Sequence, residues 1–378
     1  MTRMDRRLSM IPMLLAAMVL VAVTAPGLAD DLTNDLKIEQ QGSFQIGGSQ
    51  RTVNGATRRF DHMYVFYQIP KQARKYPLVL VHGGGQSGKQ WESTPDGREG
   101  FQTLFLRRGY PVYVVDFGGG RAGFGDLTPN PQPCVNDPNH SVTCHGVPVP
   151  SISSNETVFQ IFRYGEQYPN FFPDTAFPKN DPNALDQMMR QGVPITGYNE
   201  TVISDDLAAL FNRIGPAILV THSASGRYGW LAALKTKNIV GIVSYEPTSL
   251  LFPSDGRCVN NGNAPGCHTP LSSVSAWQEV PRAEFSKLLT IPIQVVNGDH
   301  IPQAPSPLPF FEARRQFAIA ATEFANSVKV AGGDASILDL PTKGLIGNTH
   351  FMFADTNNKE VAALLSAYLE QKQLDTKK

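Results

Sequence analysis

The most informative stretch of the 378-residue chain reads Ala217-Ile218-Leu219-Val220-Thr221-His222-Ser223-Ala224-Ser225-Gly226. Its apolar start predicts a buried strand, and the small residues that follow predict a sharp turn into a helix. A serine at the tip of such a turn matches the G-x-S-x-G pattern of a nucleophile elbow, with Thr221 and Ser225 replacing the glycines. Centring the pattern on Ser225 would put Arg227 where a small residue belongs. We therefore expect Ser223 to be the nucleophile; the alternative is an ordinary helix-capping serine.

Apolar strands alternate with amphipathic helices on both sides of this stretch. The expected strands cover residues 78–81, 112–116, 217–221, 239–245, 291–296 and 337–340. The expected helices cover residues 101–108, 201–213, 226–235, 312–328 and 359–372. Residues 36–70 are typical of strands joined by turns, one of them at Asn54-Gly55. This alternation predicts an α/β fold with a mostly parallel central sheet and helices on both faces.

Two inserts, at about 117–200 and 247–290, interrupt the alternation. A long irregular stretch inside a domain is usually functional, for example a lid over a site. Seven aromatic residues fall between residues 159 and 177 of the first insert. They either form the insert's own core or line a pocket for an apolar substrate; the pocket candidates are Phe159, Phe162, Tyr164, Phe171 and Phe172.

A glycine run ends an upstream strand in Leu80-Val81-His82-Gly83-Gly84-Gly85. Consecutive glycines let the backbone approach a ligand and direct N–H groups at it. With a nucleophile elbow, such a loop supplies one oxyanion donor and the residue after the nucleophile supplies the other. We expect those donors to be the amides of Gly84 or Gly85 and of Ala224. A phosphate loop would need a GK[ST] ending, which the stretch lacks.

The general base is expected after the last strand, where Gly347-Asn348-Thr349-His350 lies before the final helix. His350 is the candidate and His300 its competitor. The acid that orients the base has two positions open to it, because Glu246 and Asp299 each follow a strand on the carboxyl edge of the sheet. The residues themselves do not decide between these carboxylates.

Several motifs resemble those of a group of secreted bacterial α/β-hydrolase esterases. They are His82–Gly85, Trp91-Glu92-Ser93-Thr94-Pro95-Asp96-Gly97-Arg98, Phe105-Leu106-Arg107-Arg108-Gly109-Tyr110, Tyr245-Glu246-Pro247 and Gly347–His350. The group is similar to the carboxylesterases that de-esterify sulfonylurea herbicides. The resemblance covers most of residues 40–370 and implies an α/β-hydrolase fold with an inserted lid. It also implies a Ser–His–Glu triad, which makes Glu246 the acid and leaves Asp299 as the alternative.

The overall composition limits the function classes. Lys+Arg and Asp+Glu are both 33, so the chain has no basic excess for a nucleic-acid partner. We expect a serine carboxylic-ester hydrolase that acts on small or medium apolar or aromatic esters and needs no metal or cofactor. The alternatives are an amidase, a lactonase or a C–C bond hydrolase with the same triad, or a non-catalytic binding protein.

The N-terminus predicts export. Arg3, Arg6 and Arg7 precede an apolar run at 11–23 and the small residues 27–29. This pattern predicts a signal peptide cleaved after Ala29, leaving a domain of residues 30–378 without a membrane anchor. A single anchor is the alternative, but the run is short for a bilayer. A periplasmic or secreted protein can form disulfides, and we expect the pairs Cys134–Cys144 and Cys258–Cys267. A homodimer is the candidate assembly.

Overall fold

The computed structural model describes residues 35–119, 121–123, 152–194, 199–255 and 277–377, and the backbone alone of three short strands between residues 135 and 148. The expected signal peptide and its cleavage site lie outside this range. Cys134, Cys258 and Cys267 also lie outside it, and Cys144 is described by its backbone alone. Neither expected disulfide therefore falls on described side chains.

An eight-stranded sheet, in the order β1-β4-β6-β5-β10-β11-β14-β15, forms the centre of the described chain. Its strands are β1 (Ile38–Ile46), β4 (Met63–Pro70), β5 (Leu78–Val81), β6 (Val112–Asp116), β10 (Ala217–His222), β11 (Ile239–Tyr245), β14 (Ile293–Asn297) and β15 (Ala335–Asp339). β4 pairs antiparallel with β1 and β6, while the other neighbours run parallel. The predicted α/β fold with a mostly parallel sheet is confirmed.

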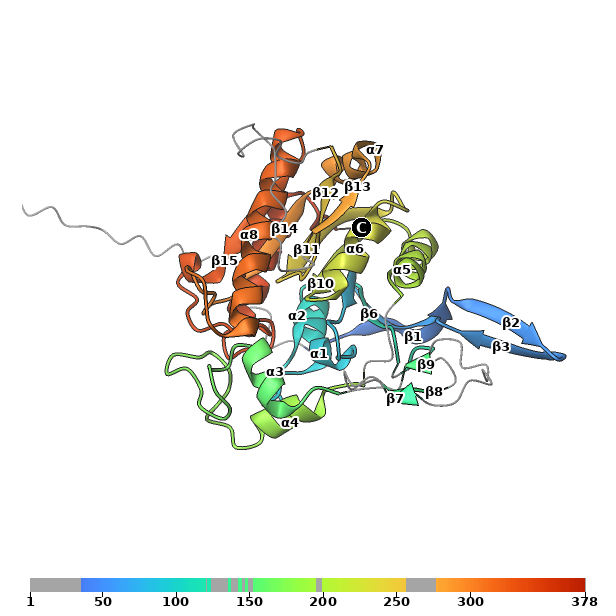
Figure 1. Ribbon diagram of the computed structural model, residues 1–378. Coiled ribbons are helices and arrows are strands. Elements are labelled where there is room, and N and C mark those ends of the chain that lie inside the picture. Colours follow the sequence, from blue (N-terminus) through green and yellow to red (C-terminus); the bar gives the residue numbers. More distant parts are fainter. Residues whose placement is uncertain are drawn as a thin grey trace, which may run out of the picture. The chain divides into compact units, whose positions relative to one another are not determined.

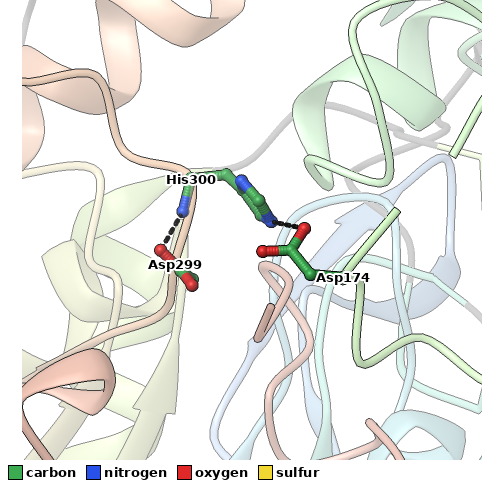
Figure 2. A group of neighbouring side chains, drawn as sticks. All are labelled: Asp174, Asp299 and His300. Atoms are coloured by element: carbon green, nitrogen blue, oxygen red, sulfur yellow. Dashed lines mark hydrogen bonds and ion pairs between the residues drawn. The ribbon is translucent and has the colours of Figure 1, made fainter. Parts of the chain in front are cut away.

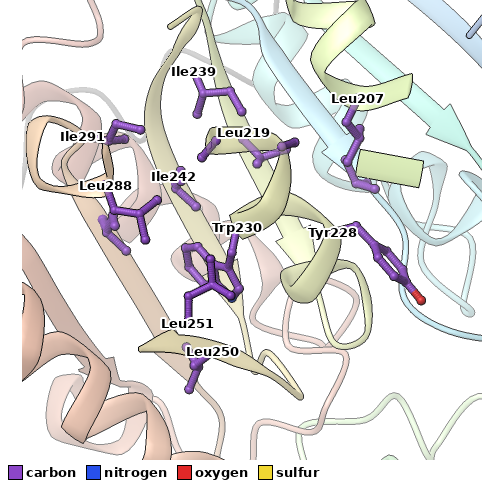
Figure 3. Close-up of a cluster of buried hydrophobic side chains, with 14 of the residues drawn as sticks. Leu207, Leu219, Tyr228, Trp230, Ile239, Ile242, Leu250, Leu251, Leu288 and Ile291 are labelled. Carbon is purple, nitrogen blue, oxygen red and sulfur yellow. The ribbon is translucent and has the colours of Figure 1, made fainter. Parts of the chain in front are cut away.

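Both faces of the sheet are covered by helices. These are α2 (Phe101–Arg107), α5 (Glu200–Ile214), α6 (Ser225–Ala233), α8 (Pro309–Val330) and α9 (Asn358–Gln371). Successive strand side chains point to opposite faces. Val79 and Val81 pack with α5, α6 and α8 in one apolar cluster, whereas Leu78 and Leu80 pack with α2 and α9 in the other. Figure 3 shows part of the first cluster, including Leu207 of α5 and Trp230 of α6. The parallel strands are thus mainly apolar because their residues meet one or the other of two cores.

Shorter elements connect and extend this frame. They are β2 (Ser49–Val53), β3 (Ala56–Phe60), α1 (Lys89–Glu92), β7 (Val135–Asn136), β8 (Val142–Cys144), β9 (Val147–Pro148), α3 (Asn155–Ile161), α4 (Ala184–Arg190), β12 (Leu250–Pro253), β13 (Trp277–Val280), α7 (Arg282–Phe285), η1 (Ser286–Thr290) and η2 (Leu340–Lys343). β2 and β3 form a two-stranded ribbon (Figure 1). Asn54 and Gly55 turn it with φ of 51° and 78°, as their sequence predicts.

The first insert joins the core of the domain rather than standing apart from it. Phe159 of α3 and Met188 of α4 are buried in the apolar cluster that α2 and α9 also form. Within the described residues, no helix is both long and apolar enough to cross a bilayer.

Candidate active site

Ser223 lies at the tip of a tight turn between β10 and α6. Its φ is 55°, in the left-handed region that non-glycine residues rarely adopt. The amide of Ser223 donates to the Tyr245 carbonyl at 2.9 Å, which holds the turn against the end of β11. Ser223 is half-buried, so its hydroxyl remains reachable. A strained residue held by its surroundings in this way is typical of a functional position.

The two departures from the glycine pattern have local explanations. The buried hydroxyl of Ser225 accepts from the His222 amide at 2.9 Å and lies 3.1 Å from the Val81 carbonyl, to which it can donate. Thr221 shares a 2.7 Å hydrogen bond with Ser244. The methyl group of Thr221 lies against Gly229, where a Cβ would sit only 2.8 Å from Cγ2. Thr221 stands where the pattern has its first glycine, and Gly229 of α6 leaves the space that the threonine methyl group needs.

The glycine loop after β5 packs closely beside this turn. A Cβ on Gly83 would lie 2.7 Å from Nδ1 of His222, so only glycine fits there. The amide of Gly83 donates to Oε1 of Gln90 at 3.1 Å. In the part of the chain that the structure describes, the amides of Gly84 and Ala224 have no hydrogen-bond partner. Gly85 continues the loop with a φ of 63°.

His350 and Glu246 meet in a buried pair. Nδ1 of His350 donates to Oε2 of Glu246 at 2.6 Å, and both side chains are almost fully buried. Glu246 directly follows β11 and has a φ of 43°. The amide of Gly298 donates to Oε1 of Glu246 at 2.9 Å. No hydrogen bond among the described residues joins the Ser223 hydroxyl to His350; such contacts often close only when substrate binds.

Two buried arginines surround Glu246, and the sequence offered no sign of either. Arg163, from the first insert, binds both carboxylate oxygens of Glu246. Arg314, from α8, donates to the Glu246 backbone carbonyl at 3.0 Å, and its Nε lies 3.4 Å from Oε2. Nη2 of Arg314 also lies 3.3 Å from Nε2 of His350. The sequence could not reveal them because they lie 83 and 68 residues away from Glu246.

These contacts set the charges of the pair. Burial raises the pKa of Glu246, but the charges of Arg163 and Arg314 outweigh it and hold the pKa well below its usual value. Burial and the charge of Arg314 lower the pKa of His350 to about 3, against the opposing effect of Glu246. The pair is therefore a carboxylate beside a neutral imidazole whose proton sits on Nδ1.

His222 bridges the nucleophile strand and the His350 loop. Its ring lies 4.4 Å from the His350 ring, and its Nε2 lies 3.1 Å from the His350 carbonyl. Nδ1 lies 3.4 Å from Oε1 of Gln90. Burial lowers the pKa of His222 well below its ordinary value, so the ring is neutral. The sequence places His222 in the motif around Ser223, but it gives no sign of this contact with the His350 loop.

The Trp91–Arg98 run supports the loop that carries His350. Arg98 donates to the carbonyls of Ala354 and Asp355 at 3.3 and 3.1 Å and to Asn358 at 2.8 Å. The Asp355 carboxylate in turn accepts the Thr349 amide at 2.7 Å. Through Arg98 and Asp355, the Trp91–Arg98 motif thus helps to hold Thr349, the residue before His350.

Asp299 and His300, the alternatives for acid and base, lie side by side and make other contacts (Figure 2). Asp299 accepts the His300 amide at 2.7 Å and the Gly347 amide at 2.8 Å, so it holds the start of the His350 loop. His300 lies 3.2 Å from Asp174. One ligand atom from each of these three residues falls within 4.8 Å of the others, a grouping that could hold a metal ion. Exposed Asp174 is its third member.

The aromatic residues of the first insert divide into two groups. Phe159, Phe162 and Tyr164 are buried in the apolar cluster, and Phe171 packs against it. Phe172 instead stacks on His300, with ring centroids 4.0 Å apart. The first group therefore belongs to the apolar cluster that the insert shares with α2 and α9, and Phe172 lies outside it.

A cavity of about 430 Å³ lies elsewhere, near the ends of β1 and β2. Its lining residues are Gln45, Ile46, Gly47, Gly48, Ser49, Gln50, Arg59 and His62. None of them belongs to the group around Ser223.

Comparison with known proteins shows which family and which structures the chain is similar to. The family model described as "Alpha/beta hydrolase family" matches residues 78–373. A bacterial esterase solved at atomic resolution is 30% identical, with a TM-score of 0.69, covering 89% of this chain and 97% of its own. A protein named probable secreted lipase phiG, from a fungal species, is 27% identical over 364 residues, covering 89% of this chain and 91% of its own.

Proposed function

Because the chain belongs to the alpha/beta hydrolase family and is an esterase- or lipase-type hydrolase, we propose that it is a serine carboxylesterase in which Ser223, His350 and Glu246 form the catalytic triad. The 2.6 Å contact between His350 and Glu246, made beside the strained Ser223 turn, is the observation that carries this proposal. The carboxylate fixes the imidazole tautomer with its proton on Nδ1, so the lone pair of Nε2, which faces Nη2 of Arg314 at 3.3 Å, is the one that can take a proton.

The reaction follows from these positions. Ser223 attacks the ester carbonyl while Nε2 of His350 takes its proton, and His350 then returns that proton to the departing alcohol. The amides of Ala224 and of Gly84 or Gly85 bind the oxyanion of the tetrahedral intermediate. Removing one such donor typically costs about a hundred- to a thousandfold in rate. Water then hydrolyses the acyl-enzyme by the same route.

The proposed substrates are small or medium apolar or aromatic esters, with methyl esters of aromatic acids, such as sulfonylurea herbicides, as the narrower class. The aromatic residues of the first insert support this choice, and we propose that this insert, about residues 117–200, acts as a lid. Phe172 is the pocket candidate that lies outside the apolar cluster shared with α2 and α9.

We also propose that the chain is exported to the periplasm or beyond the cell, with cleavage after Ala29. The basic and apolar N-terminus supports this, as does the name of the fungal relative. Intact-mass measurement of the exported protein should show the loss of residues 1–29. A full-length mass in the membrane fraction would instead indicate an anchor.

The activity can be tested with p-nitrophenyl esters from acetate to palmitate. The wild type should hydrolyse the short esters. Ser223→Ala should lose this activity, whereas Ser225→Ala should keep most of it. A phosphonate that labels catalytic serines should modify the wild type and not Ser223→Ala. An unlabelled, inactive wild-type protein would contradict the proposal.

A further inference from the structure

Charge is unevenly balanced around Glu246. One buried carboxylate faces two buried guanidiniums, Arg163 and Arg314, whose side chains are exposed by only 1% and 6%. Burying an ion is costly unless it is paired, and a single arginine would pair this carboxylate. The second arginine therefore leaves a net positive charge on this group of three side chains, next to a neutral His350.

The two arginines hold the pair from different elements. Arg163 follows α3 in the first insert, where its own φ is 57°. Its Nε donates to the Asp299 carbonyl at 2.8 Å, and the carbonyl of the preceding Phe162 accepts the His350 amide at 3.0 Å. One short segment of the insert thus holds both members of the pair. Arg314 reaches them from α8 on another side.

We propose that Arg163 and Arg314 are positioning residues for the proposed reaction, which fix the Glu246 carboxylate against His350. This inference rests on the proposed function, because it assigns His350 the role of base. It makes the first insert part of the catalytic machinery as well as a cover for the site.

The groups that face His350 come from several elements. Glu246 follows β11, Arg163 comes from the insert, Arg314 from α8 and His222 from β10. Asp355 lies beyond Thr349 on the His350 loop. A cation near an imidazole disfavours its protonation, and a carboxylate favours it. The two guanidiniums should therefore extend activity toward low pH.

The test is the pH profile of kcat/KM on a short p-nitrophenyl ester, with rates divided by the active sites titrated with a phosphonate. The wild type should vary little between pH 5 and pH 8. Arg314→Met removes the charge at similar length, and we expect its kcat/KM to fall about tenfold or more between pH 8 and pH 5. Arg314→Lys keeps the charge and should restore most of the wild-type profile.

Arg163→Met should change the profile in the same direction. It should also lower kcat about tenfold at pH 8 with KM little changed, because Glu246 then loses its two-pronged partner. Arg315→Met is the matched control, since it removes a neighbouring α8 cation that pairs with Glu312 instead. If Arg163→Met does not fold, Arg314→Met against Arg314→Lys makes the same comparison.

Two results would overturn the inference. One is a wild-type profile in Arg314→Met; the other is an equal change in Arg315→Met. Either result, in a protein whose Ser223 is labelled and which hydrolyses the ester, leaves the serine esterase intact. Failure of labelling and turnover in the wild type would count against the proposed function itself.

Discussion

Glu246 and Asp299 follow neighbouring strands, and their partners give them different tasks. Glu246 accepts a hydrogen bond from Nδ1 of His350, whereas the partners of the Asp299 carboxylate within the described chain are the backbone amides of His300 and Gly347. We predict that Glu246→Gln lowers kcat about a thousandfold or more, as expected when the imidazole loses its orienting anion. Asp299→Asn keeps one acceptor oxygen and should cost far less. Steady-state kinetics on a short ester makes the comparison.

Folding must be separated from catalysis here, because Glu246→Gln also leaves two buried arginines without their carboxylate. Glu246→Asp keeps the charge at shorter reach and is the conservative control. Near-ultraviolet circular dichroism should show native packing in each variant. A larger kcat loss in Asp299→Asn than in Glu246→Gln would move the acid to Asp299.

Residues with a local signature could be proposed from the sequence, and residues defined by long-range contacts could not. Ser223 and His350 each sit in a short motif that follows a predicted strand, and these motifs suggested them. Arg163 lies in an insert without periodic pattern, and Arg314 lies in the second turn of a long helix. Nothing near either residue in the sequence points to Glu246, which each reaches only through the fold.

At the scale of elements, helix α6 packs on β10 through glycine. A Cβ on Gly229 would lie 2.8 Å from Cγ2 of Thr221 and 3.0 Å from Cδ2 of Leu219. We predict that Gly229→Ala lowers the free energy of unfolding by about 1–3 kcal/mol through overpacking. Thr221→Ser removes Cγ2 and keeps the hydroxyl that bonds Ser244. The double variant should therefore recover about 1 kcal/mol or more.

Urea unfolding of the four proteins in this cycle gives the coupling energy. Gly192→Ala, where the new Cβ would meet its nearest neighbours at 3.3 and 3.4 Å, serves as the control. Strictly additive changes in Gly229→Ala and Thr221→Ser would show that the methyl group does not set the space for α6.

The predicted bounds of helices and strands agree best with the observed bounds where the apolar pattern of the sequence is strongest. The strands at 78–81, 112–116 and 239–245 were predicted with the bounds that β5, β6 and β11 have. α8 begins at Pro309, three residues before the predicted start, because proline is well suited to the first helical position. α3 and α4 have seven residues each, about two turns, too few for a helical period to stand out.

For the molecule as a whole, a buried acid joins α5 to the turn after β1. Oδ1 of Asp206 accepts the Gly48 amide at 2.8 Å, while its buried Oδ2 has no partner among the described residues. A Cβ on Gly47 would lie 1.8 Å from Oδ1, so the backbone closes tightly over the carboxyl group. Burial, with smaller effects from Asp61 and Asp205, raises the pKa of Asp206 to about 7.

This raised pKa predicts how global stability changes with pH. Between the unfolded value of about 4 and the folded value of about 7, the native chain binds more protons at Asp206 than the unfolded chain does. The stability contributed by this site is therefore complete below pH 4 and is lost as the pH rises to 7. Asp206→Asn retains the acceptor for Gly48 and removes the titration. We predict that its free energy of unfolding, relative to wild type, increases from pH 5 to pH 8 in urea titrations. Asp205→Asn, which removes an exposed neighbouring carboxylate paired with Lys235, should show a smaller increase; an equal one would contradict the role of Asp206.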